Sequence, residues 1–232
     1  MYKTLYLIYR STLKGMIFLQ SLIDFVLHID AHLVSIVNTF GDLTYLILFS
    51  IIFIETGAVI LPFLPGDSLL FAATALSAKP EYGLSVWIFV GIFCLAALLG
   101  DSLNFYLGKH VGMALRRHPF FGRFISDEKM VEAEHFFEKH GNISITLARF
   151  IPIIRTFAPF VAAGSNMPYK DFIKYNIIGN IAWVSICCSA GYFFGNIPFV
   201  KEHFSLVVIG IIVVSLIPAV LSFVKSKTKK QA

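Results

Sequence analysis

Charge is what this chain has least of: 14% of its 232 residues are Asp, Glu, Lys or Arg, whereas 57% are apolar. Soluble domains carry about 25% charged residues, so this composition does not suit a water-exposed globule. The three cysteines show neither a disulfide framework nor zinc-type spacing with histidine. Nucleophile–base, P-loop and dinucleotide motifs are missing too. We therefore expect a membrane protein without catalytic residues, metal or cofactor, not an enzyme.

Three apolar segments, 84–107, 172–195 and 204–224, are long enough to cross a bilayer, which takes about 20 residues of helix. The N-terminal segment 1–42 is harder to place. It begins like a signal peptide, but acids and histidines interrupt its apolar stretch, and no clear cleavage site follows. We expect a retained helix there, either amphipathic or membrane-spanning.

Two further apolar segments, 43–78 and 143–165, are broken by proline. Proline lacks a backbone N–H and clashes with the preceding turn, so neither segment should form one unbroken span. Broken backbone at membrane depth is tolerated only where protein or a wet cavity satisfies it. The sequence thus predicts two re-entrant helical hairpins. The residues expected to shape them are Pro62, Pro65, Gly66, Pro152, Pro159 and Gly164.

Basic residues are unevenly distributed between the loops. Segment 109–140 carries six Lys or Arg and the tail 225–232 carries four, whereas 79–83 and 196–203 carry one each. By the positive-inside rule, both termini and segment 109–140 are cytoplasmic. We expect 109–140 to be amphipathic at the membrane surface. The basic tail favours contact with anionic lipid over nucleic acid.

The order of segments suggests an internal repeat. Each broken segment precedes a predicted span, and Gly100-Asp101 in one span echoes Gly179-Asn180 in the other. The expected fold is an all-α polytopic membrane protein, an inverted repeat of re-entrant hairpin plus transmembrane helix, with 43–224 as one transport domain. Such transporters bind substrate at the midplane, beside broken helices. Asp101 and Asn180 would support that site with polar contacts.

Four charged residues lie inside the broken segments: Glu55, Asp67, Arg149 and Arg155. A charge at membrane depth costs at least ~2.5–3.5 kcal/mol on insertion scales, so it usually faces a partner or a wet cavity. Two acids in one segment and two arginines in the other predict a shared polar site. The bilayer aromatics, Trp183 among them, are expected to anchor at the membrane interface instead.

Three stretches resemble signatures of the DedA family of bacterial inner-membrane proteins. They are ETGAVILPFLPGDSLLF, GDSLNFYLGK and RFIPIIRTFAPFVAAGSNMPYKDFIKYNIIGNIAW, and the resemblance extends over roughly residues 20–220. It implies re-entrant hairpins, recycling of the carrier lipid undecaprenyl phosphate, and dependence on the proton-motive force. It also implies that the family's essential acidic pair falls on Glu55 and Asp67, and its arginine pair on Arg149 and Arg155.

The four residues suit lipid phosphate transport on chemical grounds. Arginine stays charged and offers a planar fork that matches phosphate oxygens. Arg149 and Arg155 are six residues apart, and the break at Pro152 would turn them toward one site. Once phosphate captured the arginines, Glu55 and Asp67 would lose their counter-charge, and proton uptake would follow. The acids are thus expected to be proton-relay or salt-bridge partners.

Other readings stay open at this point. The chain could transport ions or small solutes with protons, or flip or scramble phosphatidylethanolamine. It could also be a membrane scaffold whose buried charges only hold the fold together. Membrane lipids, an anionic isoprenoid phosphate and protons are the expected partners, and the sequence does not decide whether the protein forms a homo-oligomer.

Overall fold

All regular structure in the described part of the chain is helical, which confirms the all-α prediction. The computed structural model describes residues 24, 28–57, 66–117, 131, 135, 137–165, 167–204, 206–207 and 209–211, without side-chain detail at 111–117, 152–153 and 201. The predicted span 204–224 falls largely outside these residues, as do the tail 225–232 and residues 1–23.

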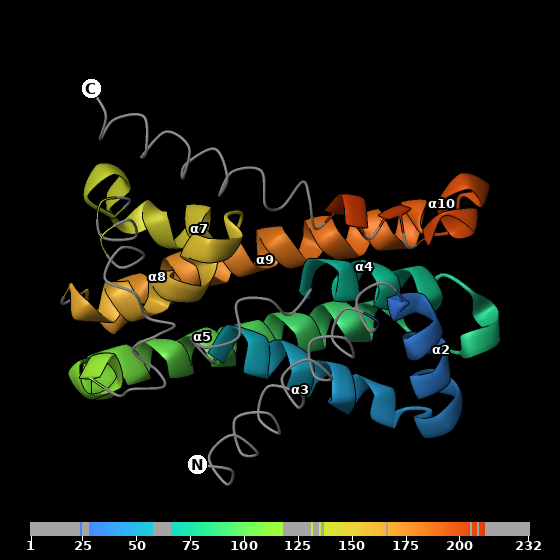
Figure 1. Cartoon of the computed structure of the whole chain (residues 1–232), viewed down its shortest axis with the longest axis horizontal. Coiled ribbons are helices and arrows are strands. Elements are labelled where there is room, and N and C mark those ends of the chain that lie inside the picture. Colours follow the sequence, from blue (N-terminus) through green and yellow to red (C-terminus); the bar gives the residue numbers. More distant parts are fainter. Residues whose placement is uncertain are drawn as a thin grey trace, which may run out of the picture.

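Two long helices, α5 (Val86–Arg117) and α9 (Tyr169–Phe194), run along the length of the molecule (Figure 1). Within them, Val86–His110 and Tyr169–Phe194 are long and apolar enough to cross a membrane. The helix α5 extends ten residues past the predicted end of the span at 107. The cytoplasmic segment predicted from 109 therefore begins as a continuation of this helix, because no proline interrupts it before Arg117.

The first broken segment contains the helices α3 (Leu43–Gly57) and α4 (Gly66–Ser77). Residues 58–65, with Pro62 and Pro65, lie outside the described residues. A shorter helix, α2 (Ile29–Phe40), precedes α3 and ends at Gly41.

The second broken segment contains the short helix α7 (Ser144–Ala148) and the helix α8 (Pro152–Gly164). Pro152 is the first residue of α8, a position where its missing N–H costs no helical hydrogen bond. The chain leaves the helical path between Arg149 and Ile151, where Ile151 has an extended conformation. Pro159 lies inside α8 and is buried. The helix α10 (Pro198–Glu202) follows α9.

Each broken segment divides its two helices between the two long helices. The helices α3 and α8 pack mainly on α5, whereas α4 and α7 pack mainly on α9. In both segments the first helix packs on the long helix that follows that segment, and the second helix packs on the other long helix. A two-fold repeat would produce such a pattern; the inverted repeat and the re-entry of the hairpins remain predictions.

Two glycines allow this close packing at equivalent contacts. A Cβ atom on Gly100 of α5 would collide with α3, lying 2.9 Å from the carbonyl oxygen of Phe53. A Cβ atom on Gly179 of α9 would lie 2.9 Å from the Cα atom of Thr146 in α7. Any larger residue would force the first helix of each broken segment away from its long helix.

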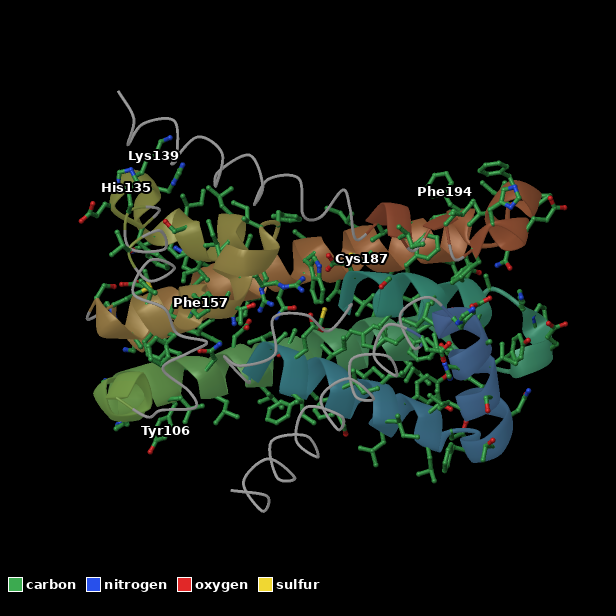
Figure 2. All side chains as sticks on the ribbon, viewed as in Figure 1. Tyr106, His135, Lys139, Phe157, Cys187 and Phe194 are labelled. Atoms are coloured by element: carbon green, nitrogen blue, oxygen red, sulfur yellow. The ribbon has the colours of Figure 1, made fainter. Side chains whose placement is uncertain are left out.

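The apolar side chains form an interior and an exposed outer surface. Phe89 and Phe93 of α5 are fully buried against Leu48 and Ile52 of α3. Trp87, by contrast, is 80% exposed, and many large apolar side chains on the long helices also face outward. Such extensive apolar exposure is expected of a surface that contacts lipid. Figure 2 shows Cys187 between Tyr106 and Phe194, which lie toward opposite ends of the molecule.

Candidate functional site

The four charged residues predicted for the site all lie where the helices of the broken segments end or begin. Glu55 is in the last turn of α3, and Asp67 is the second residue of α4. Arg149 directly follows α7, and Arg155 is the fourth residue of α8. The helix ends thus bring charges that are about a hundred residues apart in sequence into one polar region.

Arg155 pairs with both predicted acids. Its Nη2 donates to Oε1 of Glu55 at 2.8 Å, and its Nη1 donates to Oδ1 of Asp67 at 2.8 Å. The side chains of Arg155 and Glu55 are 11% and 5% exposed, but that of Asp67 is 21% exposed. We name these three residues, together with Trp183, the Arg155 cluster. Its one cation faces two carboxylates, and Asp67 is its most accessible ion-pair member.

Trp183 of α9 belongs to this cluster, so its predicted place at the membrane interface is wrong. It is only 3% exposed, and its indole Nε1–H donates to Oδ1 of Asp67 at 2.7 Å. The guanidinium carbon of Arg155 lies 5.1 Å from the centre of a Trp183 ring, and that of Arg149 lies 5.9 Å away. These distances allow cation–π attraction to both arginines. Trp183 is buried because it lies on the face of α9 that meets the helix breaks.

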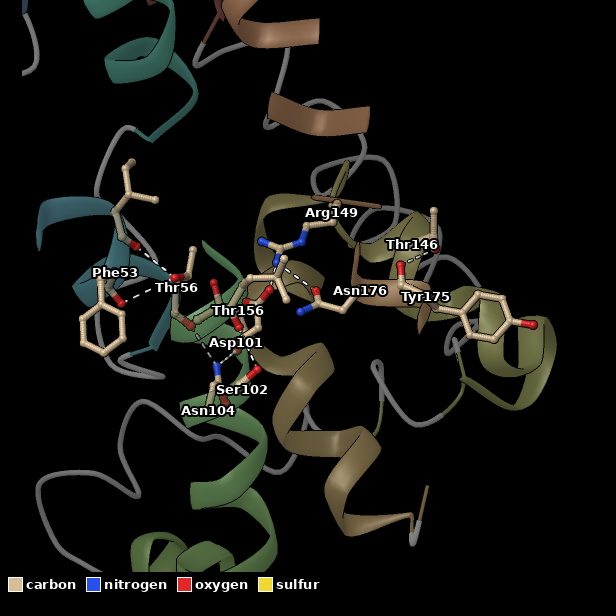
Figure 3. Close-up of polar contacts among 12 residues, drawn as sticks. Phe53, Thr56, Asp101, Ser102, Asn104, Thr146, Arg149, Thr156, Tyr175 and Asn176 are labelled. Atoms are coloured by element: carbon tan, nitrogen blue, oxygen red, sulfur yellow. Dashed lines mark hydrogen bonds and ion pairs between the residues drawn. The ribbon is translucent and has the colours of Figure 1, made fainter. Parts of the chain in front are cut away.

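Arg149 lies in a second group, which we name the Arg149 cluster: Arg149, Asp101, Asn176 and Asn180. It forms an ion pair with Asp101 of α5, and both side chains are only 3% exposed. Its Nη2 also donates to Oδ1 of Asn176 at 2.9 Å. With its amide oriented to suit its neighbours, Asn180 accepts from Nη2 at 3.3 Å. Figure 3 shows Arg149 between Asp101 and Asn176.

Asn104, one turn beyond Asp101 on α5, connects the two broken segments. Its Nδ2 donates to the backbone carbonyl of Thr56 at 3.3 Å and to that of Thr156 at 2.9 Å (Figure 3). Carbonyls at the end of a helix lack partners within the helix, so a side-chain donor stabilises the end of α3. Asn104 thereby holds α3 and α8 beside the charged clusters.

The helix ends favour two of these four charges. A helix carries partial positive charge at its N-terminus and partial negative charge at its C-terminus. Asp67 at the start of α4 and Arg149 at the end of α7 both have the favourable sign. Glu55 near the end of α3 and Arg155 in the first turn of α8 have the unfavourable sign, and they pair with each other instead. Ionised, the two arginines and three acids leave one negative charge in excess.

The predicted supporting residues take different places. Gly66 begins α4 beside Glu55, where a Cβ atom would collide with the carboxylate. Gly164 ends α8, at the opposite end of that helix from Arg155, and a Cβ atom there would meet nothing within 4 Å. Asp101 and Asn180, predicted as supporting polar residues, both contact Arg149.

Helical spacing could have identified the three site residues that the sequence analysis did not predict, which are Asn104, Asn176 and Trp183. Asn176, Asn180 and Trp183 follow one another at steps of four and three, which places them on one face of a helix. Asp101 and Asn104 are three apart and share a face in the same way.

Among the described residues, no group of three or more His, Cys, Asp or Glu side chains is arranged to hold a metal ion.

Comparison with known proteins identifies relatives along most of the chain. The VTT domain family matches residues 64–193, which is more than half of the sequence. Protein DedA of Escherichia coli K12 is 47% identical over 209 residues, covering 89% of this chain and 94% of its own. No solved structure matches the chain.

Two more distant relatives are described as membrane proteins. Uncharacterized membrane protein MT0380 of Mycobacterium tuberculosis is 42% identical over 172 residues, covering 74% of this chain and 75% of its own. Inner membrane protein YghB of Escherichia coli K12 is 33% identical over 180 residues, covering 78% of each chain. With two long apolar helices and these relatives, the chain is a membrane protein that belongs to the DedA family, whose members carry the VTT domain.

Proposed function

We propose that this protein is a lipid transporter of the bacterial inner membrane, which flips undecaprenyl phosphate toward the cytoplasmic leaflet. The observation that carries the proposal is the pair of arginine clusters at the helix breaks, deep among apolar helices. In this account the broken segments are re-entrant hairpins of an inverted repeat. The equivalent packing of their helices on α5 and α9 supports that arrangement.

A phosphate headgroup needs positive charge and directed donors while its tail stays in hydrocarbon. Arg155 supplies two N–H groups already directed at carboxylate oxygens, 2.8 Å away. Phosphate oxygens fit the same planar fork. The N-termini of α4 and α8 add positive potential beside it.

Proton coupling follows from the balance of charge in the Arg155 cluster. Glu55 and Asp67 share one arginine, so an arriving phosphate competes with them for it. A carboxylate that loses its counter-charge in an apolar surrounding becomes costly and is neutralised by a proton. Binding of the headgroup would thus draw in a proton, and release of the headgroup would return it.

The experiment is translocation in proteoliposomes. Undecaprenyl phosphate and phosphatidylethanolamine are followed separately, with and without an imposed pH gradient, for the wild type and Arg155→Ala. Movement of the isoprenoid phosphate that is lost in the variant supports the proposal. Movement of phosphatidylethanolamine alone keeps the transport class and overturns the substrate. If well-folded protein moves neither lipid, solute transport or a structural role is favoured.

A structural role is the second candidate, because both arginines are already ion-paired. In that case the clusters would only tie the broken segments to the long helices. Exchanging the charges of a pair would then preserve biological function, since the bond is kept. A lipid phosphate site, in contrast, needs the positive charge on α8.

A further inference from the structure

We propose that Trp183 donates a hydrogen bond to the lipid phosphate, and that the Asp67 carboxylate holds the place of a phosphate oxygen until the substrate displaces it. The inference rests on the proposed function and names the second headgroup donor. The observation behind it is a shared acceptor: Oδ1 of Asp67 accepts a hydrogen bond from Nη1 of Arg155 at 2.8 Å and another from Nε1 of Trp183 at 2.7 Å.

Two donors from separate helices therefore converge on one anionic oxygen. Arg155 comes from α8 and Trp183 from α9, while the acceptor comes from α4. A phosphate oxygen at this position would receive the same two charge-assisted hydrogen bonds. The carboxylate of Asp67 thus has the charge and acceptor geometry of the ligand that we expect to replace it.

Asp67 is the ion-pair member best placed to leave. Its side chain is 21% exposed, against 5% for Glu55 and 11% for Arg155. Glu55 binds the other nitrogen of the guanidinium group, so Arg155 would keep a partner and its orientation during the exchange.

The indole N–H makes the exchange specific for an anion. It is a donor only, and Trp183 is 3% exposed, so water is a poor replacement partner. A buried donor that loses its acceptor is costly. Departure of Asp67 is therefore favourable only when another acceptor takes its place. An alcohol headgroup lacks the charge that both donors favour.

The Arg149 cluster does not offer such a position. Arg149 and Asp101 are each 3% exposed, and Asn176 and Asn180 also accept from the arginine. Its carboxylate would have to leave a more enclosed place than that of Asp67. The exchange therefore belongs to the Arg155 cluster.

The test uses the fact that the chain has only two tryptophans. Trp87 is 80% exposed and lies outside both clusters, so Trp87→Phe leaves Trp183 as the single tryptophan of the full-length protein, which is excited selectively over the tyrosines. In nanodiscs this variant is titrated with farnesyl phosphate, a short isoprenoid phosphate, and with farnesol as the uncharged control. Trp183 emission should change saturably with the phosphate and not with the alcohol.

Binding of radiolabelled farnesyl phosphate is measured in parallel. Trp183→Phe keeps an aromatic ring but removes the N–H, so affinity should fall about tenfold, as for loss of one hydrogen bond to a charged group. Asp67→Asn removes the competing charge, so affinity should rise. Trp87→Phe should bind like the wild type. Size-exclusion profiles establish that each variant is folded.

The possible outcomes distinguish a failure of this inference from a failure of the proposed function. If the wild type binds farnesyl phosphate better than farnesol, but Trp183 emission is unchanged and Trp183→Phe binds equally well, the inference is wrong and the proposed function stands. If Asp67→Asn binds more weakly, Asp67 is no competitor and the exchange is overturned. If the wild type does not prefer the phosphate, both proposals fail.

Discussion

The Arg149 and Arg155 clusters are neighbours, each built around one arginine, yet they differ in charge balance and in exposure to solvent. Arg149 has one acid, Asp101, and both side chains are 3% exposed. Arg155 has two acids, and one of them, Asp67, is 21% exposed. The first cluster is enclosed and neutral, whereas the second has an excess of negative charge and a more exposed acid.

The difference suggests a division of work between two arginines that look equivalent in sequence. A buried ion pair contributes little net stability, but breaking it leaves an uncompensated charge. The closed Arg149 cluster therefore suits a fixed connection between α5, α7 and α9. The open Arg155 cluster suits exchange with a ligand. Trp183 contacts both arginines and would transmit a change in one cluster to the other.

The largest expected effect on stability is that of Arg149→Ala. It leaves Asp101, whose side chain is 3% exposed, without a counter-charge, and should lower the free energy of unfolding by about 3–5 kcal/mol. Arg155→Ala should be costly too, because it removes the counter-charge of Glu55, which is 5% exposed, although Asp67 keeps the Trp183 N–H. Denaturant unfolding in detergent measures both. Removing Asp101 as well should restore part of the loss in Arg149→Ala; an additive further loss would contradict the pairing.

The glycines at the helix contacts should give a smaller effect that differs between the clusters. Gly179→Ala brings a methyl group into close contact with the aliphatic part of Arg149, whose Cγ would lie 3.1 Å from it. Gly100→Ala presses on the end of α3, next to Glu55. Each should cost about 1–3 kcal/mol of stability through overpacking, and transport should fall more in Gly100→Ala. Gly91→Ala on α5 is the matched control, because nothing lies within 4 Å of its Cβ position.

Glu55→Gln should have the smallest effect on the fold and a selective effect on coupling. Glutamine keeps the shape of the side chain and one acceptor oxygen toward Arg155, but its amide cannot take up and release a proton as a carboxylate does. Transport should lose its response to an imposed pH gradient, as measured in proteoliposomes. Asp101→Asn in the closed cluster is the control and should keep that response. An unchanged response in Glu55→Gln would remove this residue from the relay.

Much of the site could be predicted because its signals are local in the sequence. Charges within apolar runs marked Glu55, Asp67, Arg149 and Arg155, and proline marked the second helix break. The pairing could not be predicted, since it depends on how the broken segments lie against the long helices. Only the packing of α8 on α5 and of α4 on α9 shows that one arginine takes both acids.

Trp183 shows why residue type alone misled the prediction. Tryptophan in a membrane protein is commonly interfacial, but here its position three residues after Asn180 places it on the inward face of α9. The helix α5 also continues past the predicted end of the span at 107. Basic residues begin at Lys109, yet a change in polarity does not end a helix when no breaker follows.

In the proposed division of roles, the Arg155 cluster binds the headgroup while the Arg149 cluster holds the fold. This division is tested most directly by two charge exchanges, Glu55→Arg with Arg155→Glu and Asp101→Arg with Arg149→Glu. Translocation of undecaprenyl phosphate is measured for both proteins in proteoliposomes, after each is shown to be folded. The exchange in the Arg155 cluster should abolish transport, whereas the exchange in the Arg149 cluster should retain it in part. Normal transport after the Glu55 and Arg155 exchange would contradict this division of roles.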